Sequence, residues 1–129
     1  MFEKLSDSEK VLAFIEVANE HDIKFDEQLL DSYIYLLKVN CNIPFGYSFV
    51  FHPLPYSNEL RQDLMGLKMA GYAVSGSILV TDKGKKWIQY RQTIIPDFKG
   101  LIERIGEFVS GGLLDPKGLA DAVYARITV

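Results

Sequence analysis

The chain has few of the residues that build catalytic or metal centres. Its one cysteine, Cys41, cannot form an intrachain disulfide and fits a reducing compartment. Its two histidines, His21 and His52, have no partner at H-x-x-x-H or C-x-x-C spacing. The sequence also lacks a G-x-S-x-G, a Walker and a G-x-G-x-x-G motif. We therefore expect no enzyme activity, no cofactor and no metal.

Long apolar segments are also missing. No stretch approaches the roughly 18 consecutive apolar residues of a membrane-spanning helix. The first ten residues, MFEKLSDSEK, are charged and lack the apolar segment of a secretory signal. The hydrophobic fraction of 48% is nevertheless ample for a packed core in a chain of 129 residues. We expect a single cytoplasmic domain spanning residues 1–129, without a membrane partner.

The net charge of −3 is unevenly distributed along the chain. Residues 1–31 hold nine acids and three bases, whereas the remaining residues hold eight acids and eleven bases. Residues 78–91 contain one acid, Asp82, and four bases. A local basic segment can meet phosphates, although strong non-specific DNA binding usually accompanies a larger overall excess of positive charge.

Capping residues and apolar periodicity predict a mainly helical chain. Four suitable N-caps are present: Ser6 or Asp7, Asp26, Ser57 and Thr81. Gly71 stands directly after a predicted helix, where the backbone of the residue often adopts the left-handed αL conformation. The first helix shows one apolar stripe, with Glu9, Glu16 and Glu20 on a solvated face. The predicted helices cover about residues 8–21, 27–39, 58–70, a segment after Thr81, 96–110 and 116–126.

The β-structure is predicted to be small. Residues 47–53 alternate as a strand with an aromatic face, and residues 72–74 and 78–80 flank Gly76 as a tight hairpin. We expect residues 47–81 to combine these segments into a three-stranded patch beside an exposed helix. The expected fold is mainly α with a small antiparallel sheet: a winged helix-turn-helix core over about residues 8–91 and a helical extension over about 96–127.

A family resemblance rests on the segments LLDSYIYLL, YSFVF, LPYS, ELRQDLMGLKMAG and VTDKG. They resemble the YwgA-like winged-helix proteins of prokaryotes, which are related to the SocA-like (Panacea) antitoxin domain. Leu54 replaces the usual glycine and Val80 replaces leucine. The second helix lacks the basic residue expected near its start and has Glu27 and Asp31 there instead. The resemblance implies a winged-helix fold that binds DNA or protein, without enzyme activity. The matching residues are Pro55, Tyr56, Ser57, Glu59, Leu60, Asp63, Leu64, Leu67, Gly71, Thr81 and Gly84.

Ten residues form the predicted DNA-binding surface. Arg and Gln side chains suit base edges, a helix N-terminus can bind phosphate, and Lys and Arg can contact the backbone. Each position also has a structural alternative: capping by Ser57, packing by Tyr56, or a solvated helix face for the charged residues. The ten residues are Tyr56, Ser57, Asn58, Arg61, Gln62, Lys68, Lys83, Lys85, Lys86 and Arg91.

Two hypotheses follow. In the first, the chain is a transcriptional regulator that reads double-stranded DNA with residues 58–70 and forms a homodimer through the apolar stripe of residues 96–127. In the second, the same helix face binds a protein, as in an antitoxin-like module or adaptor without DNA binding. The acidic N-terminal third and the neutral recognition helix favour the second hypothesis.

Overall fold

The computed structural model describes residues 2, 4–51, 53–74, 78–111 and 116–127. This part of the chain is mainly helical and carries two small antiparallel sheets, so the predicted α+β class is confirmed. None of its helices is both long and apolar enough to cross a bilayer. The elements are α1 (Asp7–Glu20), α2 (Glu27–Asn40), β1 (Val50–Phe51), β2 (Pro55–Tyr56), α3 (Asn58–Met69), β3 (Ala73–Val74), β4 (Leu79–Val80), α4 (Asp82–Ile94), α5 (Pro96–Ser110) and α6 (Pro116–Ile127).

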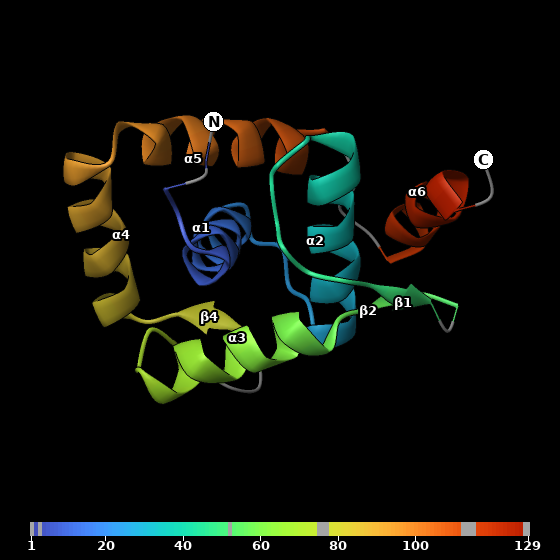
Figure 1. Ribbon diagram of the computed structural model, residues 1–129, viewed down its shortest axis with the longest axis horizontal. Coiled ribbons are helices and arrows are strands. Elements are labelled where there is room, and N and C mark those ends of the chain that lie inside the picture. The colour runs from blue at the N-terminus through green and yellow to red at the C-terminus, as the bar shows by residue number, and fades with distance from the viewer. Residues whose placement is uncertain (1, 3, 52, 75–77, 112–115, 128–129) are drawn as a thin grey trace.

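Helix α1 occupies the centre of the fold. It is seen nearly end-on in Figure 1, framed by α2, α3, α4 and α5. It contacts α3, α4, α5 and β4, and residues 11–15 are all buried. The apolar stripe predicted for this helix is buried, but the buried surface is wider than one stripe because neighbouring elements cover most of the helix circumference. The predicted solvated face is wrong for Glu9, which is ion-paired with Arg91, and for Glu16, which is partly buried.

The C-terminal helices pack on this body. The stripe of α5 places Phe98, Leu101 and Ile105 in the core, where α5 contacts α1 and α4. Helix α6 lies beside α2 and buries Leu119 and Val123 (Figure 1). Most of the described apolar residues that suggested a homodimer interface are thus buried within the chain itself, and Ile102 and Phe108 are partly buried against its core.

The sheets differ from the three-stranded patch that we expected. Val50 and Phe51 pair with Tyr56 and Pro55, whereas Ala73 and Val74 pair with Val80 and Leu79 in a separate sheet. Residues 50–51 fold back on residues 55–56 instead of joining the hairpin. Proline is accepted at such edge positions because no ladder hydrogen bond is required from it. His52 and the predicted turn at 75–77 lie outside the described residues.

Candidate functional site

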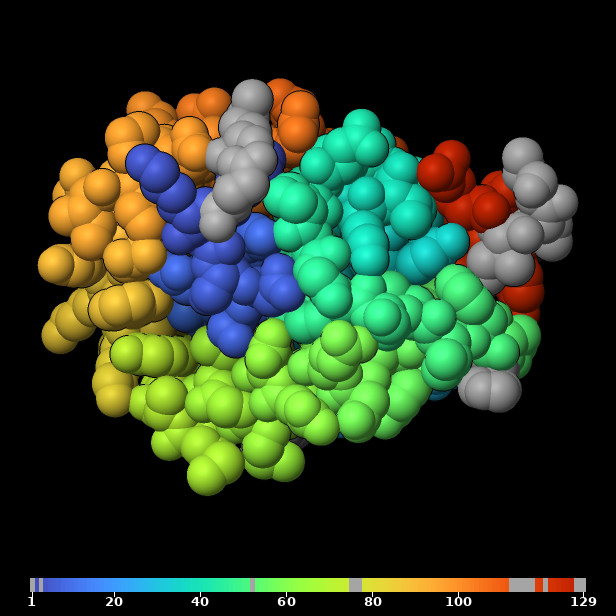
Figure 2. Space-filling model, in the orientation of Figure 1, coloured from blue at the N-terminus to red at the C-terminus, as the bar shows by residue number. Residues whose placement is uncertain are grey.

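Helix α3 presents the surface that the sequence singles out for recognition. The Ser57 hydroxyl accepts a hydrogen bond from the Leu60 backbone amide and caps the helix. Leu60, Leu64 and Leu67 face the core, since three apolar residues at this spacing share one side of a helix. The opposite row is exposed and uncharged: Asn58, Gln62, Met65 and Met69. Figure 2 shows α3 along one edge of the molecule.

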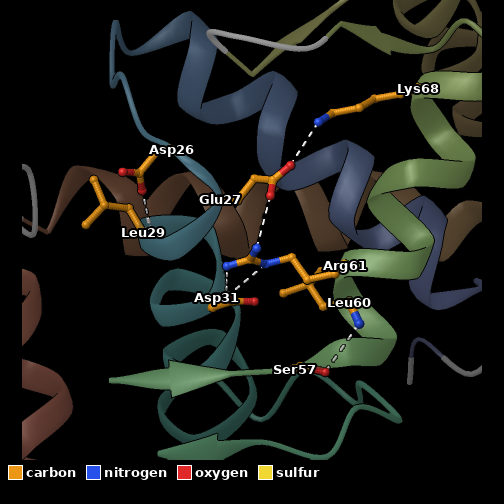
Figure 3. Close-up of polar contacts among 8 residues, drawn as sticks. All are labelled: Asp26, Glu27, Leu29, Asp31, Ser57, Leu60, Arg61 and Lys68. Carbon is orange, nitrogen blue, oxygen red and sulfur yellow. Dashed lines mark hydrogen bonds and ion pairs between the residues drawn. The ribbon is translucent and has the colours of Figure 1, made fainter. Parts of the chain in front are cut away.

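Both cations of α3 are held by acids of α2 (Figure 3). Arg61 donates from Nη2 and Nε to Oδ2 of Asp31, at 2.8 and 3.2 Å, and from Nη1 to Glu27 at 3.0 Å. Lys68 donates to the other oxygen of Glu27, also at 3.0 Å. The predicted DNA-contacting cations of this helix are therefore engaged within the chain, which leaves its exposed row without charge.

Burial strengthens the coupling between these groups. Asp31 is 1% exposed, and burial raises the pKa of its carboxyl although the Arg61 guanidinium opposes the increase. Burial acts to lower the pKa of Arg61, but the hydrogen bonds and charge of Asp31 raise it overall. The guanidinium therefore stays charged and fixed in place. The acidic residues at the start of α2 were the signal in the sequence that could have predicted an ion pair with Arg61.

The Pro55–Ser57 corner has mainly a structural role. Ser57 is buried and its hydroxyl caps α3, whereas Tyr56 is exposed and lies 5.0 Å from the Arg61 guanidinium, measured to its ring centroid. A cavity of about 290 Å³ adjoins this corner. It is lined by Gln28, Asp31, Leu54, Pro55, Tyr56 and Arg61. Because Arg61 already faces two carboxylates, the corner is a poor site for an anion.

The basic residues of α4 do not form one patch. Lys83 donates to the backbone carbonyl of Ala70 at 2.8 Å, and Arg91 donates to Glu9 of α1. Lys85 lines a cavity of about 470 Å³ that also contains Glu16 and Glu20. Lys86 is exposed and has no hydrogen bond or ion pair within the described part of the chain. Of the four predicted backbone contacts, Lys86 is thus the most available.

The cavity between α1, α4 and α5 contains a carboxyl pair. Burial raises the pKa of Glu16, and its hydrogen bond to Glu20 and that residue's charge add to the effect, whereas Lys85 opposes it. Gln89 and Gln92 complete its polar lining. Across the residues that the structure describes, no three His, Cys, Asp or Glu side chains converge as a metal site would require.

Comparisons with family models, curated proteins and solved structures found no match to this chain.

Proposed function

We propose that this chain is a protein-interaction module whose docking surface is the exposed row of α3, formed by Asn58, Gln62, Met65 and Met69. One observation carries the proposal: α3 directs both of its cations to α2, and its row of Asn58, Gln62, Met65 and Met69 presents methionines and uncharged polar groups to solvent. The exposed acid of this helix, Glu59, lies in its first turn and accepts a hydrogen bond from the Ser48 backbone amide. Met65 and Met69 are 57% and 82% exposed. A row of this composition suits an apolar protein surface better than phosphates.

The chemistry of methionine suggests how the row would bind. Its unbranched, polarisable side chain adapts to irregular apolar surfaces, and methionines recur at protein-binding sites for this reason. Asn58 and Gln62 continue the row toward the N-terminus of α3 and can supply hydrogen bonds at the rim. The partner that fits is a protein with an exposed apolar segment, and an antitoxin-like or adaptor role is compatible with this surface.

Duplex DNA is less well matched to α3. Reading bases with Arg61 would require the guanidinium to leave a buried carboxylate, and such a separation leaves an uncompensated charge. Glu27, which is partly exposed beside α3, would also repel phosphates. These charges support the protein-binding proposal over direct base reading by this helix.

A winged-helix DNA-binding regulator is the second candidate. The β3–β4 hairpin follows α3 directly, as a wing would, and the exposed Lys86 and Lys85 on α4 could contact a duplex backbone. This candidate acts in the cytoplasm, where a chain with a single cysteine fits. A homodimer would need a surface other than the buried stripe of α5, and light scattering would detect one.

A photo-crosslinking amino acid at position 65 tests the first candidate. We expect it to capture a defined protein in cells. When the photo-crosslinking amino acid replaces Lys99, which is exposed on α5, we expect no capture of that protein. The purified partner should then bind the wild-type chain and bind Met65→Glu/Met69→Glu at least about tenfold more weakly. Equal capture from both positions, or unchanged binding by the double variant, would contradict the proposal.

A gel-shift titration with random duplex DNA tests the second candidate. Binding at low salt, with a salt dependence that becomes shallower when Lys85 and Lys86 are replaced by alanine, would support it. Absence of any shift at low salt would reject it.

A further inference from the structure

Three aromatic side chains, one following α3 and two on α4, form a continuous row: Tyr72, Trp87 and Tyr90. The Tyr72 and Trp87 ring centroids lie 5.8 Å apart, and those of Trp87 and Tyr90 lie 5.9 Å apart. Successive rings are nearly parallel, with interplanar angles of 22° and 25°. Tyr90 is 52% exposed, and the other two rings are partly exposed. The row therefore offers aromatic surface to solvent.

The fold holds this row in place. Trp87 and Tyr90 are three residues apart on α4 and share a side of the helix. Tyr72 follows Gly71, whose φ of 83° turns the chain out of α3. Lys83 lies 5.1 Å from the Tyr72 centroid while donating to Ala70, and the Arg91 guanidinium lies 5.5 Å from the Trp87 centroid. The rings are thus positioned before any ligand arrives.

The row borders a shallow depression of about 440 Å³. Its lining consists of the three aromatic residues together with Lys83 and Lys86, and contains no carboxylate. Lys86 has no partner within the described part of the chain, so its charge is available to a ligand. The depression therefore combines flat π-surfaces with positive charge, which suits a molecule that carries planar rings and anionic groups together.

We propose that this depression binds single-stranded nucleic acid, with bases stacking on the aromatic row and phosphates near Lys83 and Lys86. Aromatic platforms flanked by cations are the usual means of binding unpaired strands. A duplex stacks its bases internally and cannot offer their faces to the row. A proline-rich peptide could also use aromatic surface, but it would gain nothing from the two lysines. This activity goes beyond the proposed protein interaction and uses different residues.

Trp87 is the only tryptophan in the chain, so intrinsic tryptophan emission reports directly on the row. The full chain would be titrated at low salt with unlabelled dT12 and rU12, and in parallel with a random 12-bp duplex and a decaproline peptide. We expect both single strands to quench Trp87, because a base would stack beside it. Comparing dT12 with rU12 shows whether DNA or RNA is preferred, and fluorescence anisotropy of labelled strands measures the affinity.

Matched variants assign the contacts. Tyr90→Ala should weaken single-strand binding about tenfold through lost stacking, and Tyr90→Phe should retain it. Lys86→Ala should reduce the salt slope by about 0.7, the value for one phosphate contact on a single strand. Lys85→Ala is the matched control, because it removes the same charge one residue away. Since Lys85 lines the other cavity, with Glu16, this variant should change the salt slope less than Lys86→Ala does.

Several results would overturn the inference. One is the absence of both quenching and an anisotropy change with either strand at low salt. A second is equal affinity for the duplex and the single strands, and a third is unaltered single-strand binding by Tyr90→Ala. A fourth is quenching by decaproline alone. The last outcome would assign the row to peptides. Circular dichroism of Tyr90→Ala establishes that the variant is folded. Met65→Gln, which alters the exposed row of α3 without changing the charge, should bind the strands as wild type does.

Discussion

The Arg61 guanidinium lies 2.8 Å from the Asp31 carboxylate, which is buried beneath it at the junction of α2 and α3. The two residues are far apart in sequence, and their contact ties the exposed helix to the core. Glu27 extends the network by binding Arg61 and Lys68 together (Figure 3). The cations of α3 therefore contribute to tertiary structure, and the row of Asn58, Gln62, Met65 and Met69 on its outer side is left uncharged.

The two ion pairs of this network should differ in strength. In double-mutant cycles measured by urea unfolding, we expect the Arg61→Gln/Asp31→Asn pair to show a coupling above about 1 kcal/mol, because Asp31 is buried and accepts two hydrogen bonds. The Lys68→Gln/Glu27→Gln pair should couple by less than about 1 kcal/mol, since Glu27 is partly exposed and solvent screens its charge. Equal couplings would contradict the assignment of Asp31 as the central anchor.

Asp31 should also give the folding stability a specific pH dependence. Its pKa is raised in the folded state by burial, so the folded chain binds the Asp31 proton more tightly than the unfolded chain does. The resulting stabilisation is fully present below the unfolded pKa of about 3.9 and is lost as pH rises through the raised value. The unfolding free energy of wild type minus that of Asp31→Asn should therefore decrease with rising pH. A difference that stays constant or increases between pH 3 and pH 7 would show that the pKa is not raised.

Local chemistry made much of the helical structure predictable. Ser57, Thr81 and Asp26 cap their helices through side-chain oxygens, and Ser6 forms a full capping box with Glu9. These signals depend on residues within one turn of each other, so they can be recognised without tertiary information. The predicted helix bounds consequently agree with the structure to within one or two residues, except at the end of α4, for which no bound was predicted.

Contacts between distant segments were not predictable in this way. Asp63 shows the difference: its carboxylate accepts a hydrogen bond from the buried Tyr47, which lies in a separate segment before α3, and no local pattern in the sequence indicates that contact. The separate pairing of β1 with β2 was missed because the strand expected over residues 47–53 was assigned to the same three-stranded patch as the hairpin. The aromatic row joins Tyr72 to α4, and only the folded arrangement brings these rings together.

Removing the Tyr47 hydroxyl should destabilise the chain measurably. Tyr47→Phe keeps the buried ring but removes its hydrogen bond to the Asp63 carboxylate, so we expect a loss of about 1–2 kcal/mol in urea unfolding. Tyr35→Phe is the matched control: the Tyr35 ring packs on Phe49 and Phe51, and its hydroxyl has no hydrogen bond in the described ranges. The control should change stability by less than about 0.5 kcal/mol. Similar losses in both variants would mean that the Tyr47–Asp63 bond contributes little.

Gly84 should be the glycine least tolerant of a side chain among those described. A Cβ built there would lie 2.4 Å from the Tyr72 carbonyl oxygen and 2.7 Å from Cγ1 of Val80, because the start of α4 packs directly on β4 and the residue before β3. The obstacle includes backbone, which cannot rotate away as a flexible side chain could. We expect Gly84→Ala to lower the free energy of unfolding by about 2–3 kcal/mol, as overpacked sites do. The Trp87 emission should also change, because Tyr72 and α4 must separate.

Gly66→Ala and Gly106→Ala provide controls, since both lie inside helices with nothing within 4 Å of the added carbon. Alanine favours a helix over glycine, so these variants should gain up to about 1 kcal/mol. Wild-type stability in Gly84→Ala would show that α4 can move away from the hairpin at little cost, and the aromatic row would then not be held rigidly.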